Sequence, residues 1–315
     1  MPTRLVGVMA MFLLGLAGAD IPPANNPADA RIRELKIFPV DDPWNQDISA
    51  RPVDARSARI LRRIGLNKPL HPDFGTVYNG KPNGIPYVVV WGNQPRVPVI
   101  FQYADESDPG PYPIPPDAPV EGGPGATEGD RHVIVIDADH SKLYETWNSV
   151  SRDGGKRWTA GSGAIFDLQT DAPRPAGWTS ADAAGLPIFP GLVRYDEVVN
   201  LKAIHHALRF TVQHSRRAYV APARHFAARS NDEDLPPMGM RLRLKSSFDI
   251  SRYPPQAKVI LQALKTYGMF LADNGSDMYL SGSPNDAWND DDLGHLKHVK
   301  TSDFEVVEMG PITTR

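Results

Sequence analysis

Residues 174–209 hold the densest combination of acidic, basic and aromatic side chains in the sequence. Glycosidic bonds are commonly hydrolysed by two carboxylates, one acting as acid and the other as base or nucleophile. We therefore take Asp182 and Glu197 as the candidate catalytic pair. His206 is a third candidate, because a half-buried histidine has a pKa near neutrality and can act as general base beside a carboxylate. A histidine in an apolar row is more often a hydrogen-bonded core residue, and that alternative stays open.

Side chains that could bind sugars surround these candidates. Trp178 and Tyr195 could pack against sugar rings, and Arg194 and Arg209 could bind carboxylate groups bidentately. In a lyase, one of these arginines would neutralise a uronate carboxylate while His206 or Tyr195 abstracts the proton. Arg209 also alternates with apolar residues along its strand, as do the cations of a later strand. The two strands together predict a cationic band or, alternatively, a solvated outer face.

The segment 107–124 is rich in proline, with seven prolines in eighteen residues. Such a segment is stiff and extended. It predicts either one wall of a binding cleft, with Tyr112 as a platform for a ligand ring, or a strap over a core opening. Asp105, Glu106 and Asp108 are close enough in sequence to bind Ca²⁺, so they are the candidate metal ligands. Their spacing matches no EF-hand loop, and a solvated acidic loop is the alternative.

Two shorter motifs combine an acid with a histidine. His71 and Asp73 lie in a predicted turn, and Asp130 and His132 lead into the most apolar strand. Either motif could anchor its loop by local hydrogen bonds, the usual role of aspartate in turns. A metal site would require two or three such groups to converge. The sequence has no HExxH, GxSxG, P-loop or dinucleotide-binding motif, so zincins, α/β-hydrolases and nucleotide enzymes lose support.

Strand patterns dominate the elements that must position these side chains. Residues 132–137 and 142–147 predict a hairpin that contains a fully apolar strand. Further strands are predicted at residues 87–91, 97–101, 156–160, 163–168, 191–195, 204–212, 218–220, 240–245, 269–272 and 277–281. Apolar spacing and capping residues predict helices at residues 54–64, 256–267 and 290–299. The Asp-Asn-Gly sequence at 273–275 predicts a tight turn between two strands.

This pattern predicts a mainly β fold in one domain, residues 37–310. The expected architecture is an antiparallel β-sandwich of jelly-roll type with a few peripheral helices. The alternative is an α+β fold in which the helix at 256–267 packs on a single sheet. The 31 prolines argue against a helical bundle, and the net charge of −3 gives no reason to expect a nucleic-acid partner. The chain has no cysteine, which excludes disulfides and a cysteine nucleophile.

The first nineteen residues have the order of a secretory signal peptide. Arg4 precedes an apolar run over residues 5–16, and small residues follow at 17–19. The run is shorter than the roughly 20 residues that span a bilayer, and no second run of that length follows, so no membrane span is expected. Residues 20–36 predict a flexible linker with a short helix near its end. We expect a monomer that is secreted or periplasmic.

Several long strings of the sequence resemble a known family. They are FPVDDPWN at 38–45, HPDFG at 71–75, ADESDPGPYPIP at 104–115, GWTSADAAGLPIFPGLVRYDEV at 177–198, RLKSSFDIS at 243–251 and LKTYGMFLADNGSDMYLSG at 264–282. Together they resemble a family of secreted, single-domain proteins of bacteria and some fungi, over nearly the whole mature chain. The resemblance implies export and a β-rich domain. It brings no activity and no catalytic residues.

Export, a β-rich domain, loop aromatics and the acid–histidine–arginine combination together predict a carbohydrate-active enzyme. It would cleave an extracellular polysaccharide, with acidic polysaccharides as the candidate substrates, as a glycoside hydrolase or a polysaccharide lyase. The rival hypothesis is a non-catalytic glycan-binding or surface protein. No cofactor is expected beyond a structural Ca²⁺ at the acidic loop. The enzyme hypothesis requires that Asp182, Glu197 and His206 share one solvent-reaching cleft.

Overall fold

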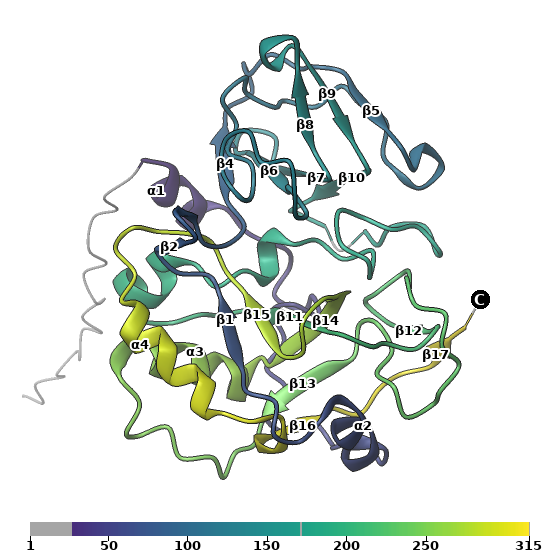
Figure 1. The fold of residues 1–315 in the computed structure, drawn as a ribbon, viewed down its shortest axis with the longest axis vertical. Helices are drawn as coiled ribbons and strands as arrows, with labels where there is room; N and C mark the ends of the chain where they lie inside the picture. Colours follow the sequence, from purple (N-terminus) through teal and green to yellow (C-terminus); the bar gives the residue numbers. More distant parts are fainter. Residues whose placement is uncertain (1–26, 171, 315) are drawn as a thin grey trace, which may run out of the picture.

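The computed structural model describes residues 27–170 and 172–314, and Figure 1 shows a smaller upper lobe above a larger lower body. We define the upper lobe as residues 87–167, from strand β4 to strand β10, and the lower body as the rest of the described chain. Sheet predominates over helix, which confirms the predicted β-rich class.

A six-stranded sheet forms the centre of the lower body, in the order β1-β15-β11-β14-β13-β16. Its strands are β1 (His71–Asp73), β11 (Leu208–Val212), β13 (Arg241–Leu244), β14 (Met269–Asn274), β15 (Tyr279–Ser281) and β16 (Phe304–Val306). The pairs β1/β15 and β11/β14 are parallel and the others are antiparallel. The predicted antiparallel sandwich is therefore not confirmed, because side-chain alternation does not specify the direction of pairing. Helix α3 (Pro255–Thr266) packs on strand β13 of this sheet. The α+β alternative predicted that this helix would pack on a sheet.

Strands β11 and β13 share this sheet, but the cationic band predicted from them is wrong. Arg209, Arg241 and Arg243 are 3%, 6% and 7% exposed. Arg241 donates to three backbone carbonyls, two of them within residues 43–51. Arg243 donates to backbone carbonyls of the same segment and forms an ion pair with Glu305. The N-terminal segment covers Arg241 and Arg243, so these two bind backbone oxygens instead of facing solvent, and Arg209 is paired with Asp182.

A four-stranded sheet in the order β10-β7-β6-β4 connects the upper lobe to the body. Its strands are β4 (Tyr87–Val90), β6 (Val133–Asp137), β7 (Lys142–Trp147) and β10 (Ser162–Asp167). The antiparallel pairing of β6 with β7 confirms the predicted hairpin. Both faces of β6 are covered, which explains its apolar sequence. Ile134 and Ile136 join the main core, and Val133 and Val135 join a second core.

The second core fills the upper lobe between this sheet and a three-stranded sheet in the order β5-β9-β8. These strands are β5 (Val99–Phe101), β8 (Val150–Arg152) and β9 (Arg157–Ala160). The proline-rich segment 107–124 closes this core. Tyr112 is fully buried there, with its ring 5.6 Å from that of Phe101 and 5.3 Å from that of Tyr144. Its hydroxyl donates to the carbonyl oxygen of Asp108 at 2.9 Å. The prediction of Tyr112 as a substrate-binding residue is therefore wrong, and the strap alternative describes the segment.

The remaining elements are short. The helices are α1 (Pro27–Glu34), α2 (Ser57–Ile64) and α4 (Asp290–Gly294). Two two-stranded sheets pair β2 (Val77–Tyr78) with β3 (Lys81–Pro82) and β12 (Tyr219–Val220) with β17 (Ile312–Thr313). The 3₁₀ turns are Ala104–Glu106, Asp153–Gly155, Phe189–Gly191, His295–His298 and Thr301–Asp303, and Asp196–Leu201 is a π-helix.

Most predicted elements form, with three differences. The strand predicted at 191–195 is absent, because the Phe189–Gly191 turn precedes an isolated bridge at Val193. The strand predicted from residue 204 begins only at Leu208, so His206 precedes it. The chain turns at residues 275–278, because Asp273 and Asn274 still belong to β14, and β14 and β15 flank β11 on opposite sides and do not pair with each other.

The N-terminal predictions are described only in part. The signal peptide predicted at residues 1–19 lies outside the described residues. Helix α1 matches the short helix predicted near the end of the 20–36 linker. Ile32 is 4% exposed and joins the main core, so the folded part begins before the boundary predicted at residue 37. Within residues 27–170 and 172–314, no helix is long and apolar enough to cross a membrane.

Replacing Tyr112 with alanine tests its role as a core residue. We expect Tyr112→Ala to lower the free energy of unfolding by about 3 kcal/mol or more, because it opens a cavity in the second core. Tyr78, which is 68% exposed, provides the control, and Tyr78→Ala should change stability by less than about 0.5 kcal/mol. Urea denaturation measures both variants. Equal stabilities for the two would contradict the buried position of Tyr112.

Candidate functional site

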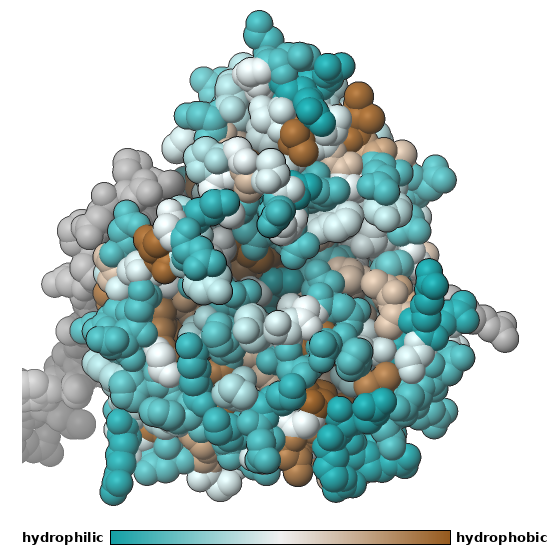
Figure 2. All heavy atoms as spheres, in the orientation of Figure 1, coloured by the Kyte–Doolittle hydropathy of each residue, from teal (hydrophilic) through white to brown (hydrophobic). Residues whose placement is uncertain are grey.

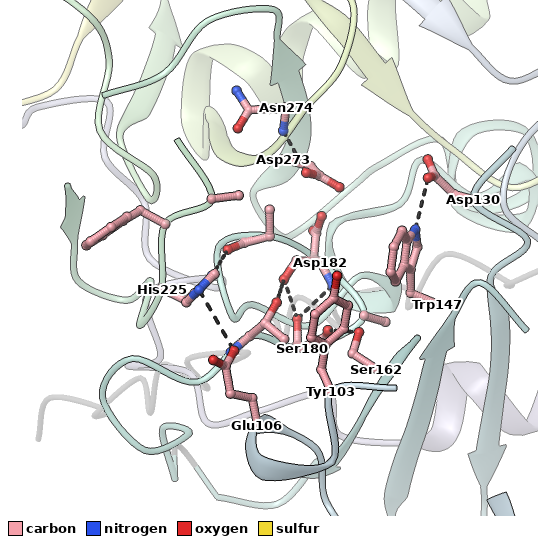
Figure 3. A pocket seen from close by; sticks show the side chains of 15 residues that line it. Tyr103, Glu106, Asp130, Trp147, Ser162, Ser180, Asp182, His225, Asp273 and Asn274 are labelled. Carbon is pink, nitrogen blue, oxygen red and sulfur yellow. Dashed lines mark hydrogen bonds and ion pairs between the residues drawn. The ribbon is translucent and has the colours of Figure 1, made fainter. Parts of the chain in front are cut away.

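A cleft of about 520 Å³ opens between the upper lobe and the lower body (Figure 3). The upper lobe lines it with Tyr103, Glu106, Asp130, Trp147 and Ser162. The lower body lines it with Thr179, Ser180, Ala181, Asp182, Ala183, His225, Phe226, Ala227, Asp273 and Asn274. Polar groups and aromatic rings therefore converge on one cavity, the usual character of a binding site.

The segment 174–189, which we call the bridging loop, determines how the two walls of the cleft are placed. Toward the upper lobe, the Ser180 carbonyl oxygen accepts a hydrogen bond from the Ser162 hydroxyl at 2.6 Å. Toward the body, the backbone N–H of Ala184 donates to the carbonyl oxygen of Ala272 at 2.9 Å. The loop thus satisfies buried polar groups on both sides, which fixes its path.

Glu145 of β7 ties the end of the bridging loop to the upper sheet. This fully buried carboxyl accepts hydrogen bonds from the backbone N–H groups of Ile188 and Phe189, the latter at 2.8 Å. Burial raises the pKa of Glu145 to about 7, although the two N–H donors oppose the rise. The contact is a direct link between lobe and body.

An ion pair between Arg209 and Asp182 lies beneath the cleft. Arg209 Nε and Nη2 donate to the two carboxylate oxygens of Asp182 at 3.0 and 2.7 Å. Arg209 Nη1 donates to the hydroxyl of Ser281 at 2.5 Å. Although burial opposes the charged form, Asp182 raises the pKa of Arg209 above its usual value. The pair is bidentate and buried, and it holds the bridging loop against strands β11 and β15.

Asp273, near the end of β14, lies beside Asp182 in the cleft (Figure 3). The backbone N–H of Asn274 donates to its Oδ1 at 2.6 Å. Burial and the nearby charge of Asp182 raise the pKa of Asp273 well above the ordinary value, although Arg209 opposes the rise. A carboxyl group with a raised pKa in a cleft is suited to act as a general acid.

His132, at the start of the apolar strand, forms an ion pair with Glu121. Its Nδ1 lies 2.7 Å from Glu121 Oε2, and its Nε2 lies 3.2 Å from the carbonyl oxygen of Ala181. Burial disfavours the charged ring, but the Glu121 carboxylate prevails and raises the pKa of His132 to about 9. The protonated ring donates from both nitrogens, so it also links the upper lobe to the bridging loop.

Asp130 completes a group of three possible metal ligands with Glu121 and His132. Their ligand atoms lie within 4.8 Å of one another, the one such group found among the described residues. Imidazole and carboxylate donors together suit a cation such as Zn²⁺. Such an ion would have to displace the proton of His132, because a protonated ring has no lone pair to offer. The contacts as they stand are those of an ion pair.

Comparison of the chain with protein families, curated proteins and solved structures finds no match. Its function must therefore be argued from the site itself.

The structure separates the predicted catalytic residues. Asp182 lines the cleft, but Glu197 and His206 do not. They form a separate buried group with Arg194, in which Glu197 lies 2.5 Å from Arg194 Nη2 and 3.1 Å from His206 Nε2. Burial would raise the pKa of Glu197, but the charge of Arg194 and the contact with His206 lower it. The structure therefore does not bring Glu197 and His206 to Asp182, and the core alternative describes His206.

The predicted substrate-binding residues also lie in different places, and most of them are not at the cleft. Trp178 is half-exposed, beside the cleft residue Thr179, and the guanidinium of Arg174 lies 5.6 Å from its ring centroid. Tyr195 packs edge-on against Trp288 at 5.1 Å, outside the cleft lining. Arg194 and Arg209 are both committed to buried ion pairs, as described above. Of these candidates only Trp178 remains in a position to contact a ligand.

The candidate Ca²⁺ ligands of the acidic loop do not converge. Asp108 forms an ion pair with Arg174 and accepts a hydrogen bond from the backbone N–H of Ile165 at 2.8 Å. Glu106 accepts from the backbone N–H of Thr179 at 3.3 Å, and Asp105 is exposed. The prediction of a cation site here is not supported, because Glu106 and Asp108 bind separate partners.

Sequence reasoning missed Asp130 and Asp273, which line the cleft, and Asp73 and His132, which lie near it without lining it. Asp130 and His132 belong to one of the two short motifs noted in the sequence, and Asp73 belongs to the other. The motifs converge, since desolvation and the charges of Glu121 and Asp130 raise the pKa of Asp73. Asp273 was recognised only as part of a turn. Their sequence signal was present, but nothing local indicated that these segments meet.

Titration of His132 should make stability depend on pH. A pKa of about 9 in the folded chain exceeds the ordinary 6.5, so the Glu121 pair contributes fully below pH 6.5 and is lost as pH rises through 9. We expect His132→Gln to be less stable than the wild type by up to about 3 kcal/mol at pH 6, and by much less above pH 9.

Thermal denaturation across this pH range measures the difference. His214→Gln is the matched control, because His214 is exposed and no carboxylate contacts it among the described residues. It should follow the wild-type curve closely. A constant difference between wild type and His132→Gln from pH 6 to pH 10 would contradict the charged state of His132.

Proposed function

We propose that this chain is a secreted carbohydrate-active enzyme that hydrolyses glycosidic bonds of an extracellular polysaccharide in the cleft between its two parts. The observation that carries the proposal is the pair of acids on opposite walls. Asp273, whose pKa is raised by burial and by the charge of Asp182, lies on the body side, and the exposed Asp130 lies on the upper-lobe side. Two carboxyl groups in different environments are what acid- and base-assisted glycoside hydrolysis requires.

The mechanism assigns one step to each acid. Asp273 donates its proton to the glycosidic oxygen as the bond from this oxygen to the anomeric carbon breaks. Asp130 accepts a proton from a water molecule, whose oxygen forms the new bond to the anomeric carbon. Proton exchange with solvent then returns both residues to their starting states. Asp182 acts as a positioning residue, because its charge favours the protonated form of Asp273.

Aromatic rings on the upper wall support a sugar ligand. Tyr103 and Trp147 line the cleft, with their ring centroids 6.4 Å apart and their planes inclined by 29°. The indole N–H of Trp147 donates to Asp130 Oδ1 at 3.0 Å. A flat aromatic surface beside the proposed base could hold a sugar ring against Asp130, since aromatic side chains provide large contact areas with little conformational entropy.

The lyase form of the hypothesis has less support. A lyase acting on uronates needs a cation to neutralise the sugar carboxylate. No lysine or arginine is among the described residues that line the cleft. Arg194 and Arg209 already neutralise Glu197 and Asp182. Hydrolysis is therefore the reaction that the lining favours.

Replacing Asp273 tests the proposal directly. We expect Asp273→Asn to lower kcat by a factor of about 10² to 10⁴, the usual contribution of a general acid. In the wild type, kcat/KM should fall as pH rises through the raised pKa of Asp273, because the acid form is the active one. Reducing-end release from a panel of neutral and charged polysaccharides measures both effects.

Asp286→Asn, at an exposed position outside the cleft lining, is the matched control and should retain wild-type rates. Binding of the same glycans is measured in parallel by affinity electrophoresis. If wild type and Asp273→Asn bind a glycan equally and neither releases reducing ends, the rival hypothesis of a glycan-binding protein is correct. Cleavage by Asp273→Asn at the wild-type rate would exclude Asp273 as the acid.

A further inference from the structure

We infer that the cleft selects glycans whose sugars carry free, protonated amino groups. This inference rests on the proposed function and specifies its substrate class. Its basis is the charge of the lining, which includes the four carboxyl groups of Glu106, Asp130, Asp182 and Asp273 and, among the described residues, no lysine or arginine.

The nearest cations are already paired with other carboxylates. Arg209 is bound bidentately by Asp182, and Arg174 is bound by Asp108. Both arginines are buried, at 3% and 5% exposure. His132 is paired with Glu121. Two carboxylates of the upper wall remain, Glu106 and Asp130. In the contacts described, neither of them is paired with an arginine or a lysine.

Both of these carboxylates can accept further hydrogen bonds. Glu106, whose side chain is 40% exposed, accepts one bond from the Thr179 N–H and lies 3.9 Å from His225 Nε2. Asp130 is exposed and accepts one bond from Trp147. A carboxylate has about four lone-pair positions, so each can also accept a hydrogen bond from a ligand ammonium group.

The aromatic rings lie beside these carboxylates on the same wall (Figure 3). A hexosamine can place its ring on Tyr103 or Trp147 and direct its ammonium group to Glu106, which leaves Asp130 free to act as the base. The ammonium group is also attracted by the aromatic faces. Figure 2 shows that this face of the molecule is largely hydrophilic, with its apolar residues scattered.

The same charges disfavour acidic glycans. A uronate or sulfate group would approach the cleft carboxylates without a lining lysine or arginine to balance its charge, and repulsion between like charges discriminates strongly in a partly buried site. An N-acetylated sugar has the same ring but no ammonium group. It would keep the aromatic contact and lose the charge-assisted hydrogen bond.

Matched polymers of β-1,4-linked glucosamine and α-1,4-linked galactosamine, each prepared at low and at high N-acetylation, test the inference. We expect kcat/KM to be at least about tenfold higher for the weakly acetylated form of the polymer that is cleaved, the effect of one charge-assisted hydrogen bond. Added salt should reduce this ratio. Glu106→Gln should also reduce it, whereas Asp105→Asn, which removes an exposed neighbouring carboxylate, should leave the ratio unchanged.

The outcomes separate the inference from the proposed function. Equal rates on the two acetylation states, or cleavage of neutral polymers only, would overturn the inference and leave the hydrolase proposal intact. Preferred cleavage of a uronate polymer, with or without added divalent cation, would also overturn it. Failure to cleave any polymer would reject the proposed function. Binding of the weakly acetylated polymers in that case would still support the inferred charge preference.

Discussion

The buried ion pair between Arg209 and Asp182 is the interaction on which both the sheet and the cleft depend. Burying two charges is unfavourable unless their hydrogen-bonding groups find partners. Here the three guanidinium nitrogens have acceptors, two on Asp182 and one on Ser281. Arg209 lies on β11, between its neighbours β14 and β15 in the central sheet, and Asp182 lies on the bridging loop. The pair therefore fixes the loop that the upper lobe rests on, and with it the separation of the cleft walls.

The same pair determines how charge is distributed around the cleft. Its carboxylate lies close enough to Asp273 to favour the neutral acid there, while Arg209 opposes this effect only in part. On the other wall the His132–Glu121 pair has a similar function, because it neutralises one carboxylate and binds the loop carbonyl of Ala181. Asp182 and Glu121 are thus each matched with a cation from their own part of the molecule. What remains toward the cavity is an acid with a raised pKa on one wall and the carboxyl groups of Glu106 and Asp130 on the other, an arrangement that burial alone would not produce.

Local sequence patterns predicted most helices and strands, but they did not predict how the strands pair or which segments cover them. The β6–β7 hairpin and helix α3 followed from periodicity, because each has a covered face that imposes its own spacing. Periodicity did not distinguish parallel from antiparallel pairs, since both place alternate side chains on opposite faces. It also could not show that residues 43–51 cover Arg241 and Arg243, because alternation is the same for a solvated and a covered face. Asp73, Asp130 and Asp273 come near one another only because of the chain topology. The short sequence motifs that contain them do not predict this.

The dense polar stretch at 174–209 shows why composition alone misplaces a site. Its acids have two different roles. Glu197 is enclosed by Arg194 and His206, and the charge of Arg194 and the contact with His206 lower its pKa despite its burial. Asp182, on the bridging loop, is paired with Arg209 in the same way. Its charge also raises the pKa of Asp273, which lies on strand β14. Charged residues that are close in sequence often satisfy one another, which stabilises the ion pairs but leaves no group free to transfer a proton. A reactive acid is instead expected where burial and a like charge act together beside a cavity, and such a site requires partners from distant parts of the chain.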